Sequence, residues 1–245
     1  VVVQLQDEVP AGEVLTVPLH PKVSEAGTRA VPLGKNLIID QTDAQLIEPN
    51  TVVTFINWGN VRIEKVDKKT DGLVVSGISA SLNLDNKDFA KTLKVTWLEQ
   101  QSTTIPALLL YYDHLIKKPI LDKDDDFKQF INRDSKYEVH ALVDVALRDL
   151  KKGQIIQIIR KGYFICDEPY SEATIDFTGK PKPVHLISIP DGSTDLNIFP
   201  KVVQEWRKAN AYVEEPKPVA AAKSGSAPAK SATISADASK LSAEI

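Results

Sequence analysis

Short runs of β-branched and aromatic residues follow one another along most of the chain, and turn residues separate them. Such runs are typical of β-strands, because branched side chains fit a pleated, half-buried surface. Residues 51–84 hold two runs joined by Lys69-Thr70-Asp71-Gly72, and the Asp-Gly pair predicts a hairpin, since glycine accepts the positive φ of such turns. Further strands are predicted over 93–99, 107–113, 136–143, 153–167 and 183–190. Because no helices alternate with these strands, we expect a mainly β fold of barrels and no doubly wound nucleotide-binding fold.

Two helices are predicted beside these strands. Residues 122–135 place aspartates ahead of Phe127, Phe130 and Ile131, which is the order that a helix dipole prefers. Residues 198–215 have helical spacing, with one apolar side made of Val202, Val203, Trp206 and Ala209. From residue 216 onward Ala, Lys, Ser and Pro dominate. We expect residues 216–245 to be a disordered linker, because they cannot bury enough apolar surface to fold alone.

The composition restricts the cellular compartment and the kinds of partner that we expect for the chain. No apolar run reaches the length of a membrane span, so we expect a soluble protein. The start VVVQLQDEV has no basic n-region and no initiator methionine, so we interpret the chain as a piece of a longer protein. The only cysteine, Cys166, stands between apolar neighbours and is predicted to be a buried core thiol of a cytoplasmic protein. The chain has a net charge of −3, so it could bind a nucleic acid only through a local patch of basic side chains.

The motifs of catalysis and metal binding are absent from the sequence. The four histidines are scattered, and neither a phosphate-binding glycine loop nor a nucleophile elbow occurs. The acidic run Asp122–Asp126 fails as a calcium loop, because Phe127 stands where the turn needs glycine. We interpret it as an acidic helix N-terminus, and a hydrolase that uses it ranks last among our hypotheses. We expect no catalytic residue and no metal site in this chain.

Basic and amide side chains among the predicted strands are the remaining candidates. Three lysines lie in or beside one loop, at Lys87, Lys91 and Lys94, and Arg29 stands alone at the start of a strand. Gln157 and Arg160 interrupt an otherwise apolar run; three residues apart on one strand they would face opposite ways, unless a bulge at or before Gly162 re-aims Arg160. The residues by themselves leave two readings open, solvated charges on faces and edges or a surface for single-stranded RNA.

Several segments together make the chain similar to one known family. They are, in chain order, VPLHPKVSEAGTRAVPL, FINWGN, LNLDNKDFAKTLKVTWL, DHLIKKPIL, DLKKGQIIQIIRKGYFICD and ISIPDG. Through roughly residues 1–195 the chain resembles the C-terminal anticodon-binding region of class I glutamyl-tRNA synthetases. The likeness is to the eukaryotic cytosolic type, which includes the glutamyl half of bifunctional glutamyl-prolyl-tRNA synthetase. The related glutaminyl enzymes share the patterns HP…G-[ST]-R…VP and Q-x-x-R-x-G-Y-F.

The resemblance implies a specific arrangement of domains. A distal β-barrel, residues 47–117, would be inserted in a proximal anticodon-binding β-barrel built from residues 1–46 and 118–200. The predicted helix over 198–215 and the linker over 216–245 would follow, and the linker would lead to a further module.

The resemblance also implies the role of the basic and amide residues. In the glutaminyl relatives the arginine of G-[ST]-R and the Gln and Arg of Q-x-x-R line the pocket for the middle anticodon base. The matching positions here are Arg29, Gln157 and Arg160, which would bind the central uridine of tRNA-Glu. More loosely, the distal barrel would meet the rest of the anticodon loop through Asn57, Lys87, Lys91 and Lys94. The resemblance leaves open which residue reads the third base.

By its family, the chain would be the non-catalytic, tRNA-binding part of a glutamate–tRNA ligase, which is an ATP-dependent enzyme of protein biosynthesis. The segment lacks the catalytic domain that uses ATP and Mg²⁺, so we expect it to need no cofactor and to be inactive alone. Its expected partners are the tRNA-Glu anticodon stem-loop and the catalytic domain of the same chain, with no membrane. The alternative hypothesis is a β-barrel protein-interaction scaffold in a multi-synthetase complex. Whether the parent is a standalone or a bifunctional enzyme stays open.

Overall fold

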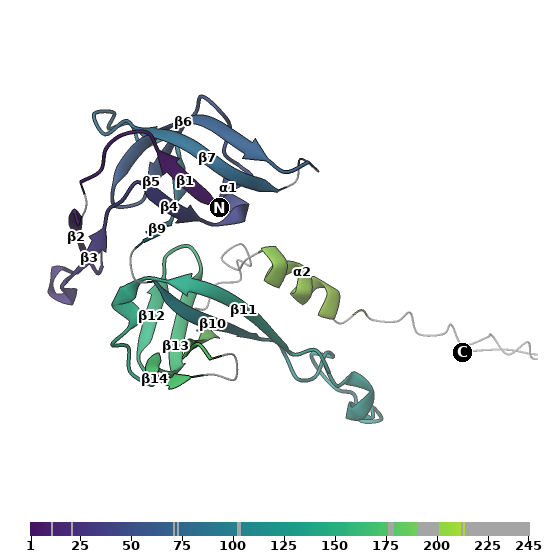
Figure 1. Cartoon of the computed structure of the whole chain (residues 1–245). Helices are drawn as coiled ribbons and strands as arrows, with labels where there is room; N and C mark the ends of the chain where they lie inside the picture. Colours follow the sequence, from purple (N-terminus) through teal and green to yellow (C-terminus); the bar gives the residue numbers. More distant parts are fainter. Residues whose placement is uncertain are drawn as a thin grey trace, which may run out of the picture. The chain divides into compact units, whose positions relative to one another are not determined.

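The computed structural model describes residues 1–10, 12–20, 22–70, 72, 74–101, 104–175, 179–190, 201–211 and 213. The chain divides into a compact unit, Val1–Tyr212, and a second unit, Val213–Ile245. Figure 1 shows that strands make up most of the first unit, as the sequence predicts. The linker expected over 216–245 lies outside the described residues.

The N-terminal sheet has seven strands among the described residues, in the order β8-β5-β6-β7-β1-β4-β9. Their bounds are Val2–Leu5 for β1, Asn36–Ile39 for β4, Val52–Phe55 for β5, Gly59–Lys68 for β6, Val75–Leu82 for β7, Leu93–Val95 for β8 and Trp97–Glu99 for β9. The predicted hairpin is confirmed, because β6 pairs antiparallel with β7 and Gly72 has a φ of 68° in the connection. The predicted strand over 93–99 is divided at Thr96 into β8 and β9, which lie on opposite edges.

The C-terminal sheet has five strands among the described residues, in the order β11-β10-β16-β13-β12. Their bounds are Ile105–Tyr112 for β10, Lys136–Val143 for β11, Ile155–Ile158 for β12, Gly162–Glu168 for β13 and Val184–Ile189 for β16. Two small two-stranded sheets accompany them, β2 (Val14–Pro18) with β3 (Thr28–Pro32) and β14 (Ser171–Ile175) with β15 (Pro181–Lys182). The short helical turns are η1 (Ser24–Ala26), α1 (Gln41–Ala44), η2 (Phe127–Phe130) and η3 (Val145–Leu147).

Each sheet encloses its own core, because alternate side chains of a strand point to opposite faces. On β1, Val3 and Leu5 are buried in the N-terminal core together with Phe55 and Ile63. On β13, Phe164 and Cys166 are buried in the C-terminal core. The predicted burial of the Cys166 thiol is therefore confirmed, and this burial raises its pKa.

The strand pairing differs from the expected domain boundaries. β1 and β4 come from the segment 1–46, yet they pair with β7 and β9 of the segment 47–117. β10, also within 47–117, pairs with β11 and β16 of the other sheet. All strands of the seven-stranded sheet therefore precede residue 100, and all strands of the five-stranded sheet follow residue 104. The physical reason lies in the shared core, since Val3 and Leu5 pack with the side chains of β5, β6 and β7.

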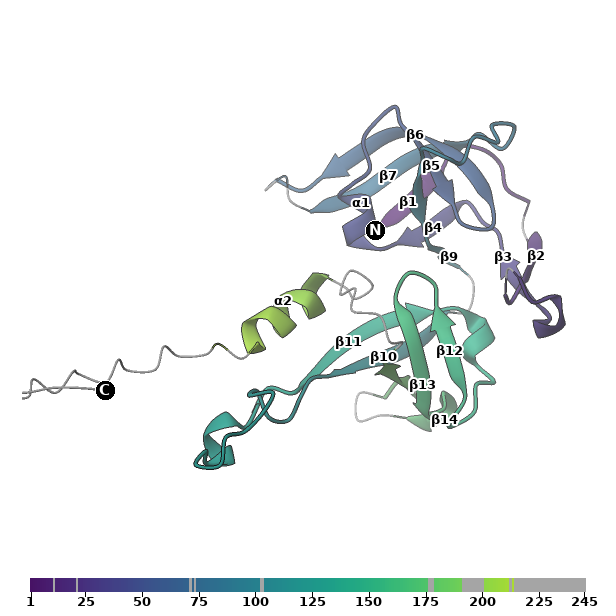
Figure 2. The ribbon, with the colours of Figure 1, turned by 180° about the vertical axis from the view of Figure 1, so that it is seen from behind.

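The internal helix predicted over 122–135 is wrong in its extent. Only the single 3₁₀ turn η2 forms, with Asp126 accepting a hydrogen bond from the backbone N–H of Lys128 at 3.1 Å. Asp122 and Asp125 instead bind the ammonium of Lys118, with 2.7 Å between Lys118 Nζ and Asp122 Oδ2. Figures 1 and 2 show the connection between β10 and β11, which carries η2, running out beyond its sheet. The acidic run therefore stabilises an extended connection.

The predicted C-terminal helix is present as α2, Lys201–Asn210. Val203 and Trp206 are buried against the C-terminal core, as expected of the apolar stripe, and the Trp206 ring lies 5.5 Å from that of Tyr137 on β11. Ala209 is exposed, contrary to the prediction, and Asn210 is buried instead and donates to the backbone oxygen of Asp134 at 3.1 Å. Residues 198–200, 212, 214 and 215 of the predicted helix lie outside the described residues, as does the side chain of Val202.

Candidate RNA-binding site

Arg29 lies on the β2–β3 hairpin, opposite Val17 in the strand register. Its Nη1 donates to Oδ2 of Asp144, and both side chains are half-buried. The other oxygen of Asp144 accepts from the backbone N–H of Ala146 at 2.9 Å and so caps η3. One carboxylate therefore joins the arginine of the first hairpin to the turn after β11.

Arg160 lies in the turn of the β12–β13 hairpin, with a φ of 64°. The prediction of one strand over 153–167 is wrong, because the chain reverses between Ile158 and Gly162, which are register partners. The Lys161 N–H donates to the Ile158 oxygen at 2.9 Å and closes the turn. Arg160 is therefore re-aimed by a tight turn, and strand alternation does not decide where its side chain points.

The guanidinium of Arg160 forms a two-bond pair with the carboxylate of Asp43 on α1. The distances are 2.6 Å from Nη1 to Oδ2 and 2.7 Å from Nη2 to Oδ1. The Asp43 side chain is 5% exposed, whereas that of Arg160 is 37% exposed. The hydrogen bonds to Asp43 raise the pKa of Arg160, so its positive charge is secure.

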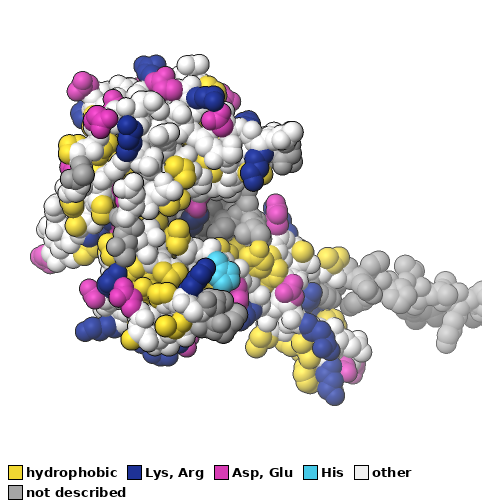
Figure 3. Space-filling model, in the orientation of Figure 1, with side chains coloured by type: hydrophobic (Ala, Val, Ile, Leu, Met, Phe, Trp, Pro, Cys, Tyr) yellow, Lys and Arg dark blue, Asp and Glu magenta, His cyan; other side chains and the backbone are white. Residues whose placement is uncertain are grey.

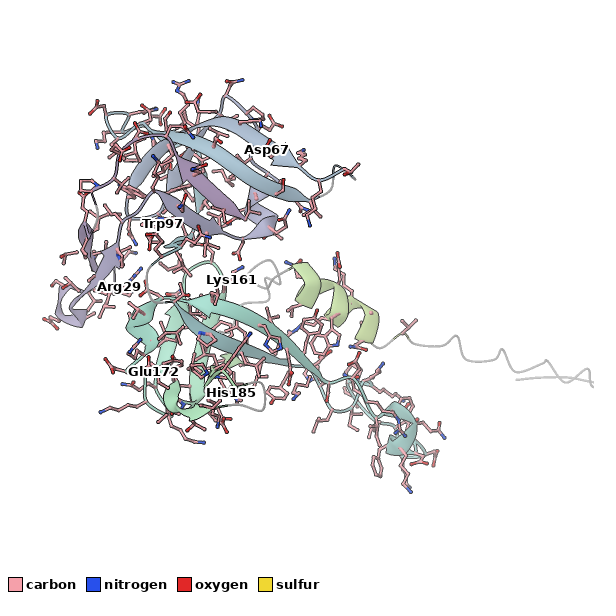
Figure 4. All side chains as sticks on the ribbon, viewed as in Figure 1. Arg29, Asp67, Trp97, Lys161, Glu172 and His185 are labelled. Carbon is pink, nitrogen blue, oxygen red and sulfur yellow. The ribbon has the colours of Figure 1, made fainter. Side chains whose placement is uncertain are left out.

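A second ion pair stands beside the first. Lys161 Nζ lies 2.8 Å from Oδ2 of Asp40, the residue that precedes α1. Figure 4 shows Lys161 at the end of the β12–β13 hairpin and Arg29 on the β2–β3 hairpin. Among the residues that the structure describes, three ion pairs, including Arg29–Asp144, connect the part of the chain before residue 100 to the part after residue 104.

Gln157 lies on β12 and is exposed, directly opposite Tyr163 on β13. It belongs to the same hairpin as Arg160, whereas Arg29 comes from a separate hairpin. Within the described residues, no hydrogen bond joins the side chains of Arg29, Gln157 and Arg160 to one another. Exposed Tyr163 was not singled out from the sequence, although its place in the Q-x-x-R-x-G-Y-F pattern could have drawn attention to it.

The lysine-bearing loop between β7 and β8 is tied to the N-terminal sheet by Asn60. This side chain is fully buried, accepts from Thr54 Oγ1 at 2.6 Å, and donates to the backbone oxygens of Asn86 and Asp88 at 2.9 and 3.0 Å. From the same FINWGN motif, the resemblance described above implies Asn57 as the RNA-binding residue. Asn57 is exposed in the β5–β6 turn, with a φ of 70°. Nothing in the local sequence distinguishes the two asparagines.

The three lysines of this loop have different surroundings. Lys87 and Lys91 are exposed. Lys94 donates to the backbone oxygen of Thr92 at 2.8 Å and to that of Phe89, so its ammonium holds the loop itself. On the face seen in Figure 3, basic and acidic side chains are interspersed.

Within the described ranges, no group of three or more His, Cys, Asp or Glu side chains could hold a metal ion. No helix among these residues has the length and apolar character to cross a membrane. The arrangement thus consists of two sheets, ion pairs that orient two arginines, and exposed amide, aromatic and lysine side chains. These are the groups that proteins use for bases and phosphates of single-stranded RNA.

Comparison with protein families agrees with this type of site. Two family models match, at residues 1–85 and 94–167, and both are described as the anticodon-binding domain of class I tRNA synthetases (E and Q). Together the matches cover more than half of the 245 residues. The chain therefore belongs to the anticodon-binding domains of the class I glutamyl- and glutaminyl-tRNA synthetases.

Several curated relatives of the chain are glutamate–tRNA ligases. The bifunctional glutamate/proline–tRNA ligase of Cricetulus griseus is 47% identical over 184 residues, which are 74% of this chain and 12% of the relative. The cytoplasmic glutamate–tRNA ligase of Arabidopsis thaliana is 36% identical over 176 residues, 72% of this chain and 23% of the relative. The corresponding Saccharomyces cerevisiae enzyme is 36% identical over 178 residues, with the same two shares. The chain thus spans 12–23% of the length of these relatives.

Proposed function

We propose that this segment binds the anticodon stem-loop of tRNA-Glu as the non-catalytic part of a glutamate–tRNA ligase. The observation that carries the proposal is the match of two anticodon-binding models, at residues 1–85 and 94–167. The identity of 47% to a bifunctional glutamate/proline–tRNA ligase favours glutamate over glutamine as the cognate amino acid.

The central uridine of the anticodon would be bound by Arg29, Gln157 and Arg160. Its Watson–Crick edge offers O2 and O4 as acceptors and N3–H as a donor, which suit guanidinium donors and an amide oxygen. What supports this assignment is that Gln157 is exposed and that Arg160 keeps over a third of its side chain exposed while its plane is held by Asp43. A guanidinium has five N–H donors, so pairing with one carboxylate leaves others for a base.

The phosphates of the anticodon loop would be bound by Lys87 and Lys91, which are exposed on the loop that Asn60 anchors. The ammonium of Lys94 is used within that loop, so its contribution would be to keep the loop in place. Asn57 would contribute through its exposed position in the β5–β6 turn.

Aminoacylation itself would take place in a catalytic domain of the same polypeptide. We infer that ATP and Mg²⁺ act there and that the present segment needs no cofactor. The cytoplasm would be the site of action, since relatives such as the Arabidopsis thaliana enzyme are named cytoplasmic.

A binding assay tests the proposal. Filter binding of the 245-residue chain should give a higher affinity for tRNA-Glu than for a variant whose central uridine is replaced by cytidine. Arg29→Ala should reduce this preference by about ten-fold, since direct base contacts are worth about 1–3 kcal/mol each. Lys91→Ala is the matched control. It should lower the affinity for both tRNAs by the same factor and make that affinity less dependent on salt concentration. Equal binding of the two tRNAs by the unaltered chain would refute the anticodon assignment.

A second candidate is a scaffold that holds other proteins in a multi-synthetase complex. It is favoured by exposed apolar side chains on the β10–β11 connection, namely Leu115, Ile120 and Phe127. Hydrophobic surface is visible there in Figure 3. The two functions are compatible, because the connection and the β12–β13 hairpin are different segments.

A further inference from the structure

The backbone of Arg160 has an unusual conformation for its residue type. A φ of 64° is uncommon in a residue with a long side chain, and it persists only where the surroundings determine it. Here the turn hydrogen bond from Lys161 to Ile158 and the two-bond pair with Asp43 act on the same residue from two sides. The direction of the guanidinium is therefore set by the turn and by one carboxylate.

Asp43 is well placed to serve as a fixed anchor. It lies in α1 with its side chain 5% exposed, and its neighbour Ala44 belongs to the N-terminal core. Two parallel N–H···O bonds fix both the position and the plane of a guanidinium, which a single bond cannot do. The core of the N-terminal sheet thus determines the orientation of an arginine that comes from the hairpin of the C-terminal sheet.

The pairing also changes what the arginine can do. The two bonds engage one N–H of each terminal nitrogen, and the remaining N–H groups stay available as donors. The carboxylate neutralises much of the charge, so attraction to any nearby phosphate falls. Hydrogen bonds that depend on direction are less affected. A guanidinium in this state favours a correctly shaped acceptor edge over bulk negative charge.

On these grounds we propose that Asp43 is a positioning residue for base recognition. It holds Arg160 in the plane needed to donate to a pyrimidine carbonyl and limits its attraction to phosphates. The inference rests on the proposed anticodon-binding function. It adds a residue that does not itself contact RNA but sets the specificity of one that does.

The neighbouring ion pair provides a matched control. Asp40 precedes the same short helix and pairs with Lys161, the next residue of the same turn, at 2.8 Å. That contact is an ion pair between one nitrogen and one oxygen, and the Asp40 side chain is 44% exposed. Asp40 and Asp43 therefore both pair the hairpin with the segment that carries α1, but only Asp43 holds a guanidinium of the proposed uridine pocket.

The test compares Asp43→Asn with Asp40→Asn in the 245-residue chain. The readout is the ratio of affinities for tRNA-Glu and for its variant with central cytidine, at two salt concentrations. Asp43→Asn keeps the side-chain shape but presents an NH₂ group to one guanidinium nitrogen, so the ratio should fall by about ten-fold. Affinity for the cytidine variant should stay the same or rise, because the Asp43 carboxylate no longer offsets the positive charge of Arg160. Asp40→Asn should change the ratio by less than about two-fold.

A merely structural role for Asp43 would give a different pattern, in which both tRNAs lose affinity by the same factor and the ratio is unchanged. That result, with discrimination by the unaltered chain, would overturn the inference and leave the proposed function standing. Absence of discrimination in the unaltered chain would overturn both. If Asp43→Asn does not fold, Arg160→Lys replaces it, since lysine keeps the charge but cannot form two parallel bonds. The ratio should then fall as well, and an unchanged ratio would refute the proposal.

Discussion

Replacement of Asn60 with alanine should lower the free energy of unfolding by about 2–4 kcal/mol. The substitution removes two donors from the backbone oxygens of Asn86 and Asp88 and one acceptor from the Thr54 hydroxyl, all around a fully buried side chain. Buried polar groups that lose their partners cost about 1–3 kcal/mol each, and nearby water can satisfy some of them. Urea unfolding followed by tryptophan fluorescence would measure the loss, because Trp58 and Trp97 pack against the same core.

Asn57→Gly is the matched control for this experiment. Asn57 belongs to the same FINWGN motif but is exposed in the β5–β6 turn, and glycine accepts its φ of 70° at no steric cost. The unfolding free energy should therefore change by less than about 0.5 kcal/mol. Equal stability of Asn60→Ala and Asn57→Gly would contradict the assignment of Asn60 as the anchor of the lysine-bearing loop. The Asn60 variant should also bind tRNA more weakly, because Lys87 and Lys91 lie in the loop that it releases.

Truncation of Phe164 to alanine should destabilise the protein by about 3–5 kcal/mol. The ring is fully buried in the C-terminal core and meets that of Tyr111 edge-on, with 5.8 Å between the centroids. Its neighbour Tyr163 points to the opposite face of β13 and is 41% exposed. Tyr163→Ala should therefore cost about 1 kcal/mol or less.

The comparison of these two variants tests the register of β13. Both remove an aromatic ring from adjacent positions of one strand, so strand propensity is matched and burial differs. Circular dichroism during urea unfolding would measure both free energies. A larger loss for Tyr163→Ala than for Phe164→Ala would mean that the strand faces the other way, which would also move Gln157 from the surface into the core.

The mainly β fold and most strand positions were predictable from sequence, because β-branched runs and an Asp-Gly turn are local signals. The segment 153–167 is one that local sequence signals predict incorrectly. Its apolar residues continue on both sides of Arg160 and Lys161, so composition predicts one long strand. The actual hairpin depends on a positive φ at Arg160 that arginine does not favour by itself. The Asp43 carboxylate that accompanies it lies 117 residues away in the chain.

The sequence predicts candidate site residues but not their surroundings. Sequence patterns selected Arg29 and Arg160, yet they could not reveal that each is paired with an aspartate of a distant segment. The same limit applies to the basic loop, where Lys94 is used internally and Asn60 does the anchoring. Hydrogen bonds between residues far apart in the chain produce no periodic pattern in the sequence. Motif matching therefore finds the candidate residue and misses the partner that orients it.

The placement of β8 and β9 on opposite edges of the N-terminal sheet has a consequence for local opening. One stretch, Leu93–Glu99, pairs with β5 at one edge and with β4 at the other. If this stretch detached, both edges would lose their outer partner in a single event, and two rows of backbone N–H and C=O groups would become open to pairing with other chains. Amide hydrogens of β4 and β5 that bond to this stretch should then exchange with one shared opening free energy, as one cooperative unit. This one stretch would protect both edges of the sheet, so its detachment would be the step most prone to start aggregation.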